Sequence, residues 1–316
     1  MSETYDYQDG PANLKGDRKG TGMDKFDRNK LSSCYINFLF GAGVNGAAFP
    51  QVENFKKAMD FMKTAKPDLE NEAFEKMIDK LEKEDRAEAR RLFIEEFKEK
   101  EKQIDWDCQS IKNIKNMFRV TYRLIYESEN RKEAMNQVNI FTANYDFIVE
   151  DSIKELGYLC NYVSASNVEN NDKFFNIVGR DYSLKREVPT FLVSKIHGDI
   201  SDPVLPGSDK FDSVLRVNKF EIFFKMKEKL SRYNSILFVI GYSGRDEHIN
   251  RILKDCVEAG LTVYWFKYKE EDIIPNSIEN KVVSIENEKT GDERMDTTEL
   301  FAKRIYKDLW EESLEK

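Results

Sequence analysis

Four short segments place glycine and small polar side chains directly after runs of apolar residues. They are GAGVNG at 41–46, TANYD at 142–146, HGD at 197–199 and GYSGRDE at 241–247. A glycine turn after a strand either lets the backbone approach a phosphate with its N–H groups, or serves a tight turn that needs positive φ. Ligands of open parallel sheets bind outside the carboxyl ends of the strands, so we expect the four segments to meet around one ligand.

The polar side chains of these segments each have a chemical and a structural interpretation. An imidazole has an unperturbed pKa near ~6.5, which suits His197 to general-base work, whereas a buried histidine bonded to a carbonyl is the structural alternative. Asn144 and Asp146 suit either the orientation of a ligand or an Asx turn. Ser243 suits a helix cap, because GYSGR lacks the G-x-S-x-G spacing of a hydrolase nucleophile. His248, the second of two histidines, is expected to be structural or exposed.

Alternating strands and helices are expected to position these segments. A short helix is expected through Ile153, another is expected to end at Gly260, and the last is expected to start near Asp296. This order is typical of a Rossmann-like α/β fold, a mainly parallel sheet with helices on both faces. Strands are expected at 34–40 and within VNIFTANYD, TFLVSKIHGD, NSILFVI, LTVYWFKY and KVVSIE.

The domain organisation follows from length and periodicity. A chain of 316 residues suits one large α/β domain with an insertion, which we expect over 23–316. Within 51–130, apolar side chains recur at helical spacing, as from Phe74 to Leu81, between Lys and Glu faces. This pattern predicts a helical insertion between two strands. Residues 1–22 lack a periodic apolar face and are expected to be a disordered tail.

Charge and cysteine content exclude several classes of partner. The net charge is −8 and the pI about 5.2, so no direct binding to nucleic acid is expected. No two of the four cysteines form a C-x-x-C pair, so a structural zinc site is not expected. No apolar run approaches the ~20 residues of a membrane span, and no signal peptide is expected, so the simplest expected location is the cytoplasm.

Four motifs resemble, in their order along the chain, those of the sirtuin-like NAD-consuming fold. They are FLFGAGVN, FTANYD, KIHGD and VIGYSGRDEHI. The chain is more closely similar to the sirtuin-like effector domains of bacterial anti-phage defence, such as those of Thoeris-type systems. The resemblance covers 34–50 and 138–270, and it lies in the order of the motifs and their positions at strand ends.

The resemblance implies a role for each matching residue. It implies that Asn144 orients ribose and water and that His197 is the catalytic histidine. It implies that the first glycine turn holds the pyrophosphate through its backbone, that Asp146 lies at the nicotinamide end, and that the loop at 241–243 contacts the adenosine ribose. The implied NAD-binding residues are Gly41, Ala42, Gly43, Val44, Asn45, Thr142, Asp146, Gly241, Tyr242 and Ser243, with Asn45 standing where the family usually has serine.

Two features differ from the protein-deacylating sirtuins. Those enzymes carry a four-cysteine zinc module after the catalytic histidine, whereas this chain has no cysteine between His197 and Ser235. Their arginine-bearing loop after the glycine turn is replaced here by AAFPQVENF. Both differences disfavour a deacylase. The resemblance further implies that Asp246 and Glu247 shape their loop and cap the helix that follows.

The expected function is therefore an NAD glycohydrolase, with NAD as substrate, no cofactor and no metal. Nicotinamide leaves the positively charged ring as a neutral molecule, so a base and an orienting amide are a plausible minimum. The alternatives are a non-catalytic module that binds ADP-ribose or a cyclic derivative, and an NAD-dependent protein deacylase. The resemblance implies an anti-phage effector that depletes NAD once activated. Control is expected from self-assembly into a homo-oligomer, with helices in 51–130 as the assembly surface, or from a ring-forming ATPase or a phage-derived activator.

Overall fold

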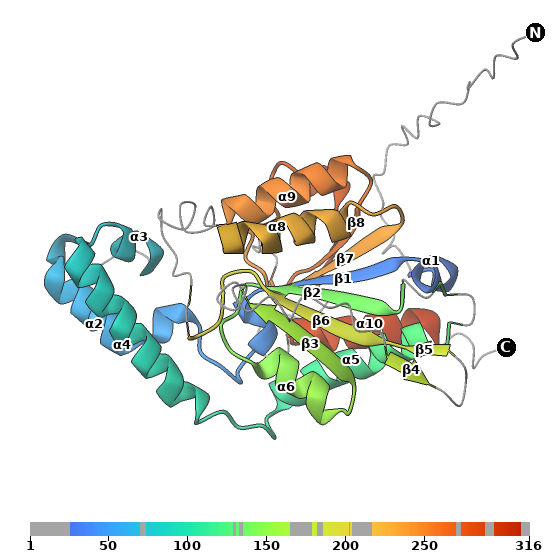
Figure 1. The fold of residues 1–316 in the computed structure, drawn as a ribbon, viewed down its shortest axis with the longest axis horizontal. Helices are drawn as coiled ribbons and strands as arrows, with labels where there is room; N and C mark the ends of the chain where they lie inside the picture. The colour runs from blue at the N-terminus through green and yellow to red at the C-terminus, as the bar shows by residue number, and fades with distance from the viewer. Residues whose placement is uncertain are drawn as a thin grey trace, which may run out of the picture.

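A layered α/β fold emerges from the computed structural model (Figure 1). The disordered tail expected at 1–22 lies outside the residues that the structure describes. The described residues are 26–69, 74–128, 131–132, 135–164, 179–181, 186–201, 203, 217–269, 273–287 and 294–310.

A seven-stranded parallel sheet lies at the centre of this fold, in the order β3-β6-β2-β1-β7-β8-β9. β1 lies between β2 and β7, where Asn37 is paired with Asn139 on one side and Leu237 on the other. The expected mainly parallel Rossmann-like sheet is confirmed. The strands are β1 (Tyr35–Phe40), β2 (Gln137–Thr142), β3 (Leu159–Ser164), β6 (Thr190–Lys195), β7 (Ser235–Ile240), β8 (Thr262–Phe266) and β9 (Val283–Ile285).

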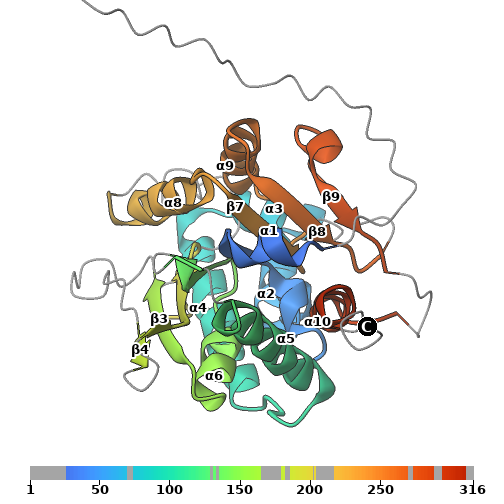
Figure 2. The ribbon, with the colours of Figure 1, turned by 90° about the vertical axis from the view of Figure 1, so that its right-hand side faces the viewer.

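Helices cover both faces of the sheet, and the two faces have separate hydrophobic cores (Figure 2). Phe38 of β1 packs against Phe301, and Phe40 packs against Phe118, with ring centroids 5.4 and 6.3 Å apart. Leu39, the residue between them, belongs to the core of the opposite face. Strands covered on both faces read as continuous apolar runs, which is why the sequence reveals them. One face is covered by α5 (Gln109–Tyr126), α6 (Ile148–Glu155) and α10 (Thr297–Leu309), the other by α8 (Val217–Leu230) and α9 (Glu247–Glu258).

Helices fill the long connection between β1 and β2. Three of them project beyond the sheet at the left of Figure 1, and we call these three the arm. The fourth, α5, packs on the sheet, so the segment 51–130 contains both an arm and a core helix. The arm consists of α2 (Lys56–Ala65), α3 (Phe74–Asp79) and α4 (Lys83–Glu101).

Aromatic and charged side chains hold the helices of the arm together and attach the arm to the turn that follows β2. The α2 helix has no side-chain cap of its own, and the buried Glu96 carboxylate of α4 accepts from the backbone N–H groups of Lys56 and Lys57 at 3.1 and 2.7 Å. Phe93 and Phe97 of α4 contact the ring of Tyr145, with centroids 6.0 and 6.4 Å apart. Tyr145 belongs to the TANYD turn, so the arm is anchored at one of the four predicted site segments.

Short elements complete the described structure, and most of them were not expected from the sequence. The edge strand β3 reads LCNYVS and is only partly buried, so its pattern is neither an apolar run nor a clean alternation. Another unexpected element is a five-residue helix, α1 (Arg28–Ser32), and the longer helix α8 was not expected either. The remaining elements are the hairpin of β4 (Gly179–Asp181) and β5 (Arg186–Val188), and the 3₁₀ turns η1 (Ala42–Asn45), η2 (Val52–Asn54), η3 (Pro67–Leu69) and η6 (Glu279–Lys281).

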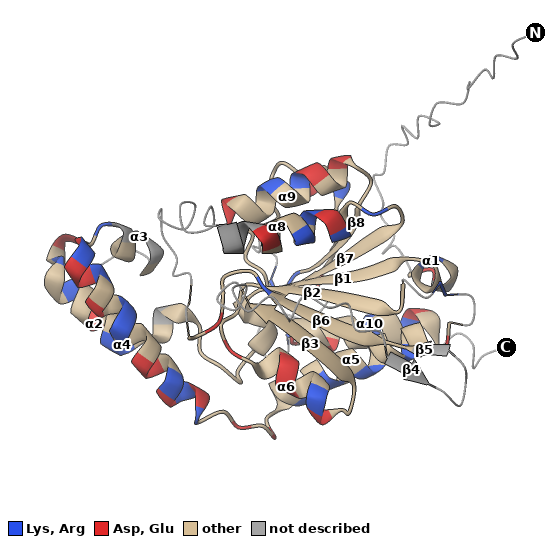
Figure 3. Cartoon of the chain, viewed as in Figure 1, with Lys and Arg blue, Asp and Glu red and all other residues tan. Residues whose placement is uncertain are grey.

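Charged residues concentrate on the helices, whereas the strands carry few of them (Figure 3). On α4, Arg91 bonds to Glu88 and Glu95, and Lys57 of α2 bonds to Glu95 and Glu99. These pairs are exposed, as expected for solvated helix faces. Among the described helices, none combines the length and the apolar composition that a membrane crossing requires.

Candidate active site

The four segments singled out in the sequence meet at the carboxyl ends of β1, β2, β6 and β7. Backbone hydrogen bonds join them across the sheet: Gly41 N–H donates to Ile240, Ala143 N–H to Phe40, and Ile196 N–H to Thr142, at 3.2, 3.0 and 2.9 Å. The chain passes from β1 to β2 on one side and returns through β7 on the other side of β1. This reversal of direction is the place where open α/β sheets form their ligand crevice.

The first glycine turn packs directly on the backbone of the second. A Cβ atom on Gly41 would lie 2.5 Å from the Gly241 carbonyl oxygen, and a Cβ on Gly43 would lie 2.8 Å from Gly241 Cα. The N–H groups of Gly41, Gly43, Val44 and Gly46 all donate to backbone carbonyls. The glycines therefore serve a close backbone contact and, at Gly46 with φ 52°, a positive-φ turn. A pyrophosphate cradle would have to use the remaining donors of the turn.

Replacing Gly241 by alanine is expected to destabilise the protein strongly. Gly241 has φ +64°, and an added Cβ would lie 2.2 Å from Val44 N, a backbone atom that cannot move aside alone. Gly157 is the matched control, because its φ is +73° and nothing lies within 4 Å of an added Cβ. Gly157→Ala should cost only the backbone strain, about 1–2 kcal/mol, and Gly241→Ala clearly more. Equal losses in urea unfolding would contradict the close-contact role of Gly241.

Asn45 and Asp146 connect the first and second segments. Asn45 Nδ2 donates to Asp146 Oδ2 at 2.8 Å, and Asp146 Oδ1 accepts from the backbone of Ile148 at 3.1 Å, at the start of α6. Both side chains are buried, and Asn45 Oδ1 has no hydrogen-bond partner among the described residues. The Asp146 carboxylate is thus held in one position, and the unpaired acceptor Asn45 Oδ1 belongs to the side chain that donates to it. Burial, followed by the charge of Asp146, raises the pKa of Glu101 at the end of α4.

Asn144 and His197 occupy equivalent positions beyond neighbouring strands. Thr142 of β2 is paired with Lys195 of β6, so each of the two residues lies two positions past the paired strand ends. Asn144 is buried, its Nδ2 donates to the Gly41 carbonyl at 3.2 Å, and its backbone N–H donates to Thr142 Oγ1 at 3.1 Å. The carboxamide oxygen of Asn144 is therefore the part that a ligand can use.

Lys195 is a site residue that the sequence analysis missed. Its side chain is fully buried, its ammonium donates to the carbonyls of Asn144 and Asp146, and it lies 3.0 Å from Glu150 Oε1 and 4.6 Å from the centre of the Phe147 ring. Burial raises the pKa of Glu150, and the nearby Lys195 opposes this. Lys195 thus fixes the backbone that carries Asn144 and Asp146. Its place at the end of β6, in KIHGD, was the available signal.

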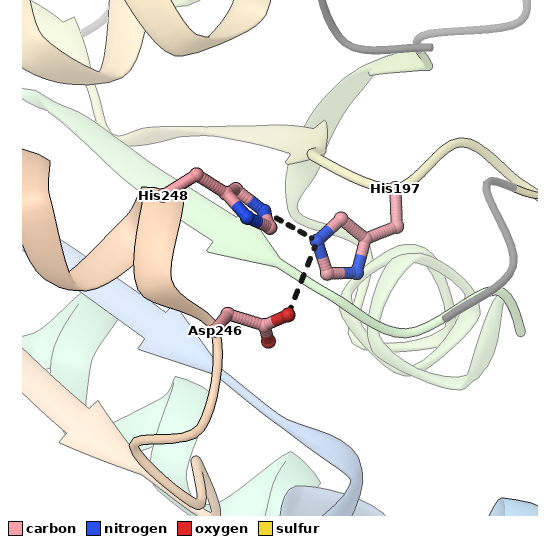
Figure 4. A group of neighbouring side chains, drawn as sticks. All are labelled: His197, Asp246 and His248. Atoms are coloured by element: carbon pink, nitrogen blue, oxygen red, sulfur yellow. Dashed lines mark hydrogen bonds and ion pairs between the residues drawn. The ribbon is translucent and has the colours of Figure 1, made fainter. Parts of the chain in front are cut away.

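His197 lies against two side chains from the start of α9 (Figure 4). Its Nε2 atom is 3.1 Å from Nε2 of His248 and 3.9 Å from Oδ1 of Asp246. Asp246 is the N-cap residue of α9, but its side chain makes no capping bond. The expected capping role of Asp246 is therefore wrong, because its carboxylate points at His197 instead. His248, expected to be structural or exposed, is half-buried and belongs to this cluster.

The loop at 241–243, which the resemblance assigns to the adenosine ribose, is stabilised by the buried side chain of Tyr242. Its buried hydroxyl accepts from Asp246 N–H at 3.2 Å and lies 3.1 Å from Asn250 Oδ1, and its ring packs 5.8 Å from that of Trp265. Burial raises the pKa of this hydroxyl. The Tyr242 side chain therefore shapes the loop, which leaves its backbone to face a ligand. Ser243 is exposed at the loop surface and does not cap α9, whose N-cap is Asp246.

The other predicted NAD-binding residues differ in exposure. Ala42 is exposed, whereas the side chains of Val44 and Thr142 are buried. Val44 packs in the hydrophobic core, so it stabilises η1 rather than offering a side chain to a ligand. Thr142 accepts the Asn144 backbone bond described above. Glu247 is exposed and lies 3.5 Å from Arg251.

Comparison with known proteins relates the site to one family. A solved structure described as "Structural Basis for the Mechanism and Regulation of Sir2 Enzymes" aligns over 91% of this chain and 96% of that chain, with 12% identity and a TM-score of 0.45. No curated protein sequence matches this chain. The family model of the SIR2-like domain matches residues 138–287, which include Asn144, His197 and the 241–247 turn. Residues 138–287 are thus similar to a SIR2-like domain.

Proposed function

We propose that this protein hydrolyses NAD at the bond between nicotinamide and ribose, giving nicotinamide and ADP-ribose. The observation that carries the proposal is the placement of Asn144 and His197 at equivalent positions beyond the paired strands β2 and β6, at the same sheet edge as the glycine turns that follow β1 and β7. The match to a SIR2-like domain over 138–287 supports a dinucleotide of the NAD type as the ligand.

Each named side chain has a step to perform in this reaction. The bond between ribose C1′ and the pyridinium nitrogen breaks, and nicotinamide leaves with the bonding electron pair as a neutral molecule. Positive charge develops on the ribose, and the fixed Asp146 carboxylate stabilises it. Water attacks C1′ in the geometry set by the Asn144 carboxamide oxygen, and His197 takes up the water proton. The proton later passes to solvent, so the products are nicotinamide, ADP-ribose and one proton.

The burial of Asn144 and Asp146 favours these roles, in which Asn144 orients the water and Asp146 stabilises the positive charge. Both have their other hydrogen-bonding atoms committed to Gly41, Asn45 and Ile148, so neither has to reorganise when charge develops. His197 lies beside Asp246, and this carboxylate stabilises an imidazolium once the proton has arrived. We therefore assign Asp246 a positioning role toward the base.

The test is to incubate the purified chain with NAD alone and measure the products by liquid chromatography. Free nicotinamide and ADP-ribose are expected in equal amounts, without any acylated peptide present. A deacylase would release nicotinamide only when an acyl-lysine peptide is added. Stable NAD or ADP-ribose binding without nicotinamide release would instead favour a non-catalytic binding module and contradict the proposal.

We also propose that the activity serves anti-phage defence in the cytoplasm, by depleting NAD once an infection signal arrives. The support for this role is the resemblance of the four motifs to sirtuin-like effector domains. An enzyme that consumes NAD must be silent until it is triggered, so control by assembly of several copies, or by a partner, belongs to the same proposal. The charged arm is the proposed assembly surface, and the intracellular NAD content of infected cells is the measurement that tests the role.

A further inference from the structure

We propose that His197, Asp246 and His248 form a binding site for one divalent transition-metal ion of the zinc class, and that an ion bound there inhibits NAD hydrolysis. The binding half of this proposal depends on the geometry of the three side chains alone. The inhibitory half rests on the proposed function, because it requires His197 to act as the base.

The spacing of the three ligand atoms fits a tetrahedral ion. Zinc–nitrogen bonds are about 2.0–2.1 Å long, so two imidazole nitrogens on one tetrahedral zinc ion lie about 3.3 Å apart. The two Nε2 atoms lie 3.1 Å apart, and one carboxylate oxygen of Asp246 lies 3.9 Å from the His197 Nε2 atom. One ligand atom from each residue lies within 4.8 Å of the other two. The two imidazoles already have the required spacing, and a side-chain movement of the Asp246 carboxylate toward them would complete the coordination.

The ligands come from rigid elements, which is a requirement for a defined metal site. His197 follows β6 and is buried, while His248 lies in the first turn of α9 with its ring 5.0 Å from that of Phe223. The backbone of Asp246 is held by the buried Tyr242 hydroxyl. Figure 4 shows all three side chains converging from these two elements on one point.

The donor set selects the class of metal. Two imidazoles and one carboxylate suit zinc, cobalt, nickel and copper, whereas magnesium and calcium require mostly oxygen ligands. The Asp246 carboxylate supplies negative charge beside the start of α9, which offsets the unfavourable effect of a helix N-terminus on a cation. Three protein ligands leave the fourth tetrahedral position to water.

Occupancy would remove the base from the reaction. Metal coordination uses the Nε2 lone pairs of both histidines, so each neutral imidazole then carries its proton on Nδ1. His197 can no longer accept the proton of the attacking water through Nε2. The ion also places a positive charge beside the ribose, where the reaction develops positive charge of its own. Both effects slow cleavage, so zinc acts here as an inhibitor rather than as a cofactor.

Cobalt absorption and zinc calorimetry test the binding half without NAD. The full chain, treated with chelator and dialysed, is expected to bind one Co²⁺ with the visible absorption of a tetrahedral site, and Zn²⁺ is expected to displace it. Magnesium should produce no such displacement. An unchanged spectrum on addition of cobalt, together with no zinc binding in calorimetry, would overturn the site.

Two ligand variants and one control assign the site to these residues. His248→Gln keeps the length and polarity of the side chain but offers a poor metal ligand, so zinc affinity should fall by more than about 100-fold. Asp246→Asn should weaken binding as well. Cys108→Ser is the control, because Cys108 is a half-exposed free thiol on another element and its loss should leave binding unchanged. Retained affinity in His248→Gln, or loss in Cys108→Ser, would place the metal elsewhere.

Nicotinamide release tests the inhibitory half. Stoichiometric Zn²⁺ should slow release by the unchanged chain, and EDTA should restore it. Zinc that binds at the cluster yet leaves the rate unchanged, or raises it, would overturn inhibition while leaving the site intact. A chain that binds zinc as described but never releases nicotinamide would contradict the proposed function and the inhibition that rests on it, not the site.

Discussion

Nicotinamide release by the His197→Ala variant is expected to be slower than by the unchanged chain by a factor of about 10²–10⁴. Alanine removes the only group assigned to take up the proton of the attacking water, and it leaves the Asn144 and Asp146 contacts untouched. NAD binding, measured by calorimetry, should change by only a few-fold, because the base acts in the transition state more than in the bound substrate.

Glu247→Gln is the matched control for His197→Ala. Glu247 lies beside the cluster in sequence but is exposed and pairs only with Arg251 among the described contacts. Its loss should leave nicotinamide release unchanged. Turnover by His197→Ala at the rate of this control, in a protein with an unchanged circular dichroism spectrum, would refute the assignment of the base.

Replacing Lys195 by methionine should lower the free energy of unfolding by about 3–5 kcal/mol at neutral pH. Methionine fills the volume of the stem, but the Glu150 carboxyl then remains buried without its cation, and the carbonyls of Asn144 and Asp146 lose a charged donor. Urea unfolding followed by circular dichroism measures the loss. Lys57→Met is the control, because Lys57 is exposed while pairing with two carboxylates, and its loss should change the unfolding midpoint little.

The loss in Lys195→Met should grow as the pH rises. Burial already raises the pKa of Glu150, and without Lys195 the largest influence that opposes this shift is lost. A carboxyl group whose pKa is higher in the folded than in the unfolded state binds more protons when folded, so the stability falls as the pH rises from the unfolded pKa toward the folded one. The difference from the unchanged chain should therefore be smaller at pH 5 than at pH 8, and Glu150→Gln added to Lys195→Met should restore part of it. A Lys195→Met variant as stable as Lys57→Met would contradict the structural role of the pair.

The parts of the fold that the sequence predicted correctly are those with strong local signals. β1, β2, β6, β7 and β8 are apolar runs buried on both faces, and α9 ends before Gly260, whose φ of 105° requires glycine. The convergence of the four turns follows from one rule, that parallel strands end at the same edge of a sheet. Once the four segments are recognised as the ends of parallel strands, this rule places them together.

The missed features depend on contacts between distant residues. Apart from its place at the end of β6, nothing local distinguishes Lys195 from an exposed lysine, because its burial comes from Glu150 and Phe147 on α6 and the turn before it. The contact of His248 with His197 depends on where α9 begins, and a shift of one residue would rotate the imidazole by about 100° around the helix axis. The edge strand β3 was missed because its half-buried residues show neither an apolar run nor a regular alternation.

The central position of β1 also determines how the chain can fold. Asn37 of β1 pairs with Asn139 and Leu237, so neither neighbour of the middle strand exists until much more of the chain has been made. Closing such long loops costs entropy before any pairing is gained, and topologies dominated by distant contacts fold slowly. The same pairings bring the glycine turns together. The proposed ligand crevice and the middle of the sheet therefore depend on the same late pairings, and we expect a nascent chain that stops before β7 to have neither complete.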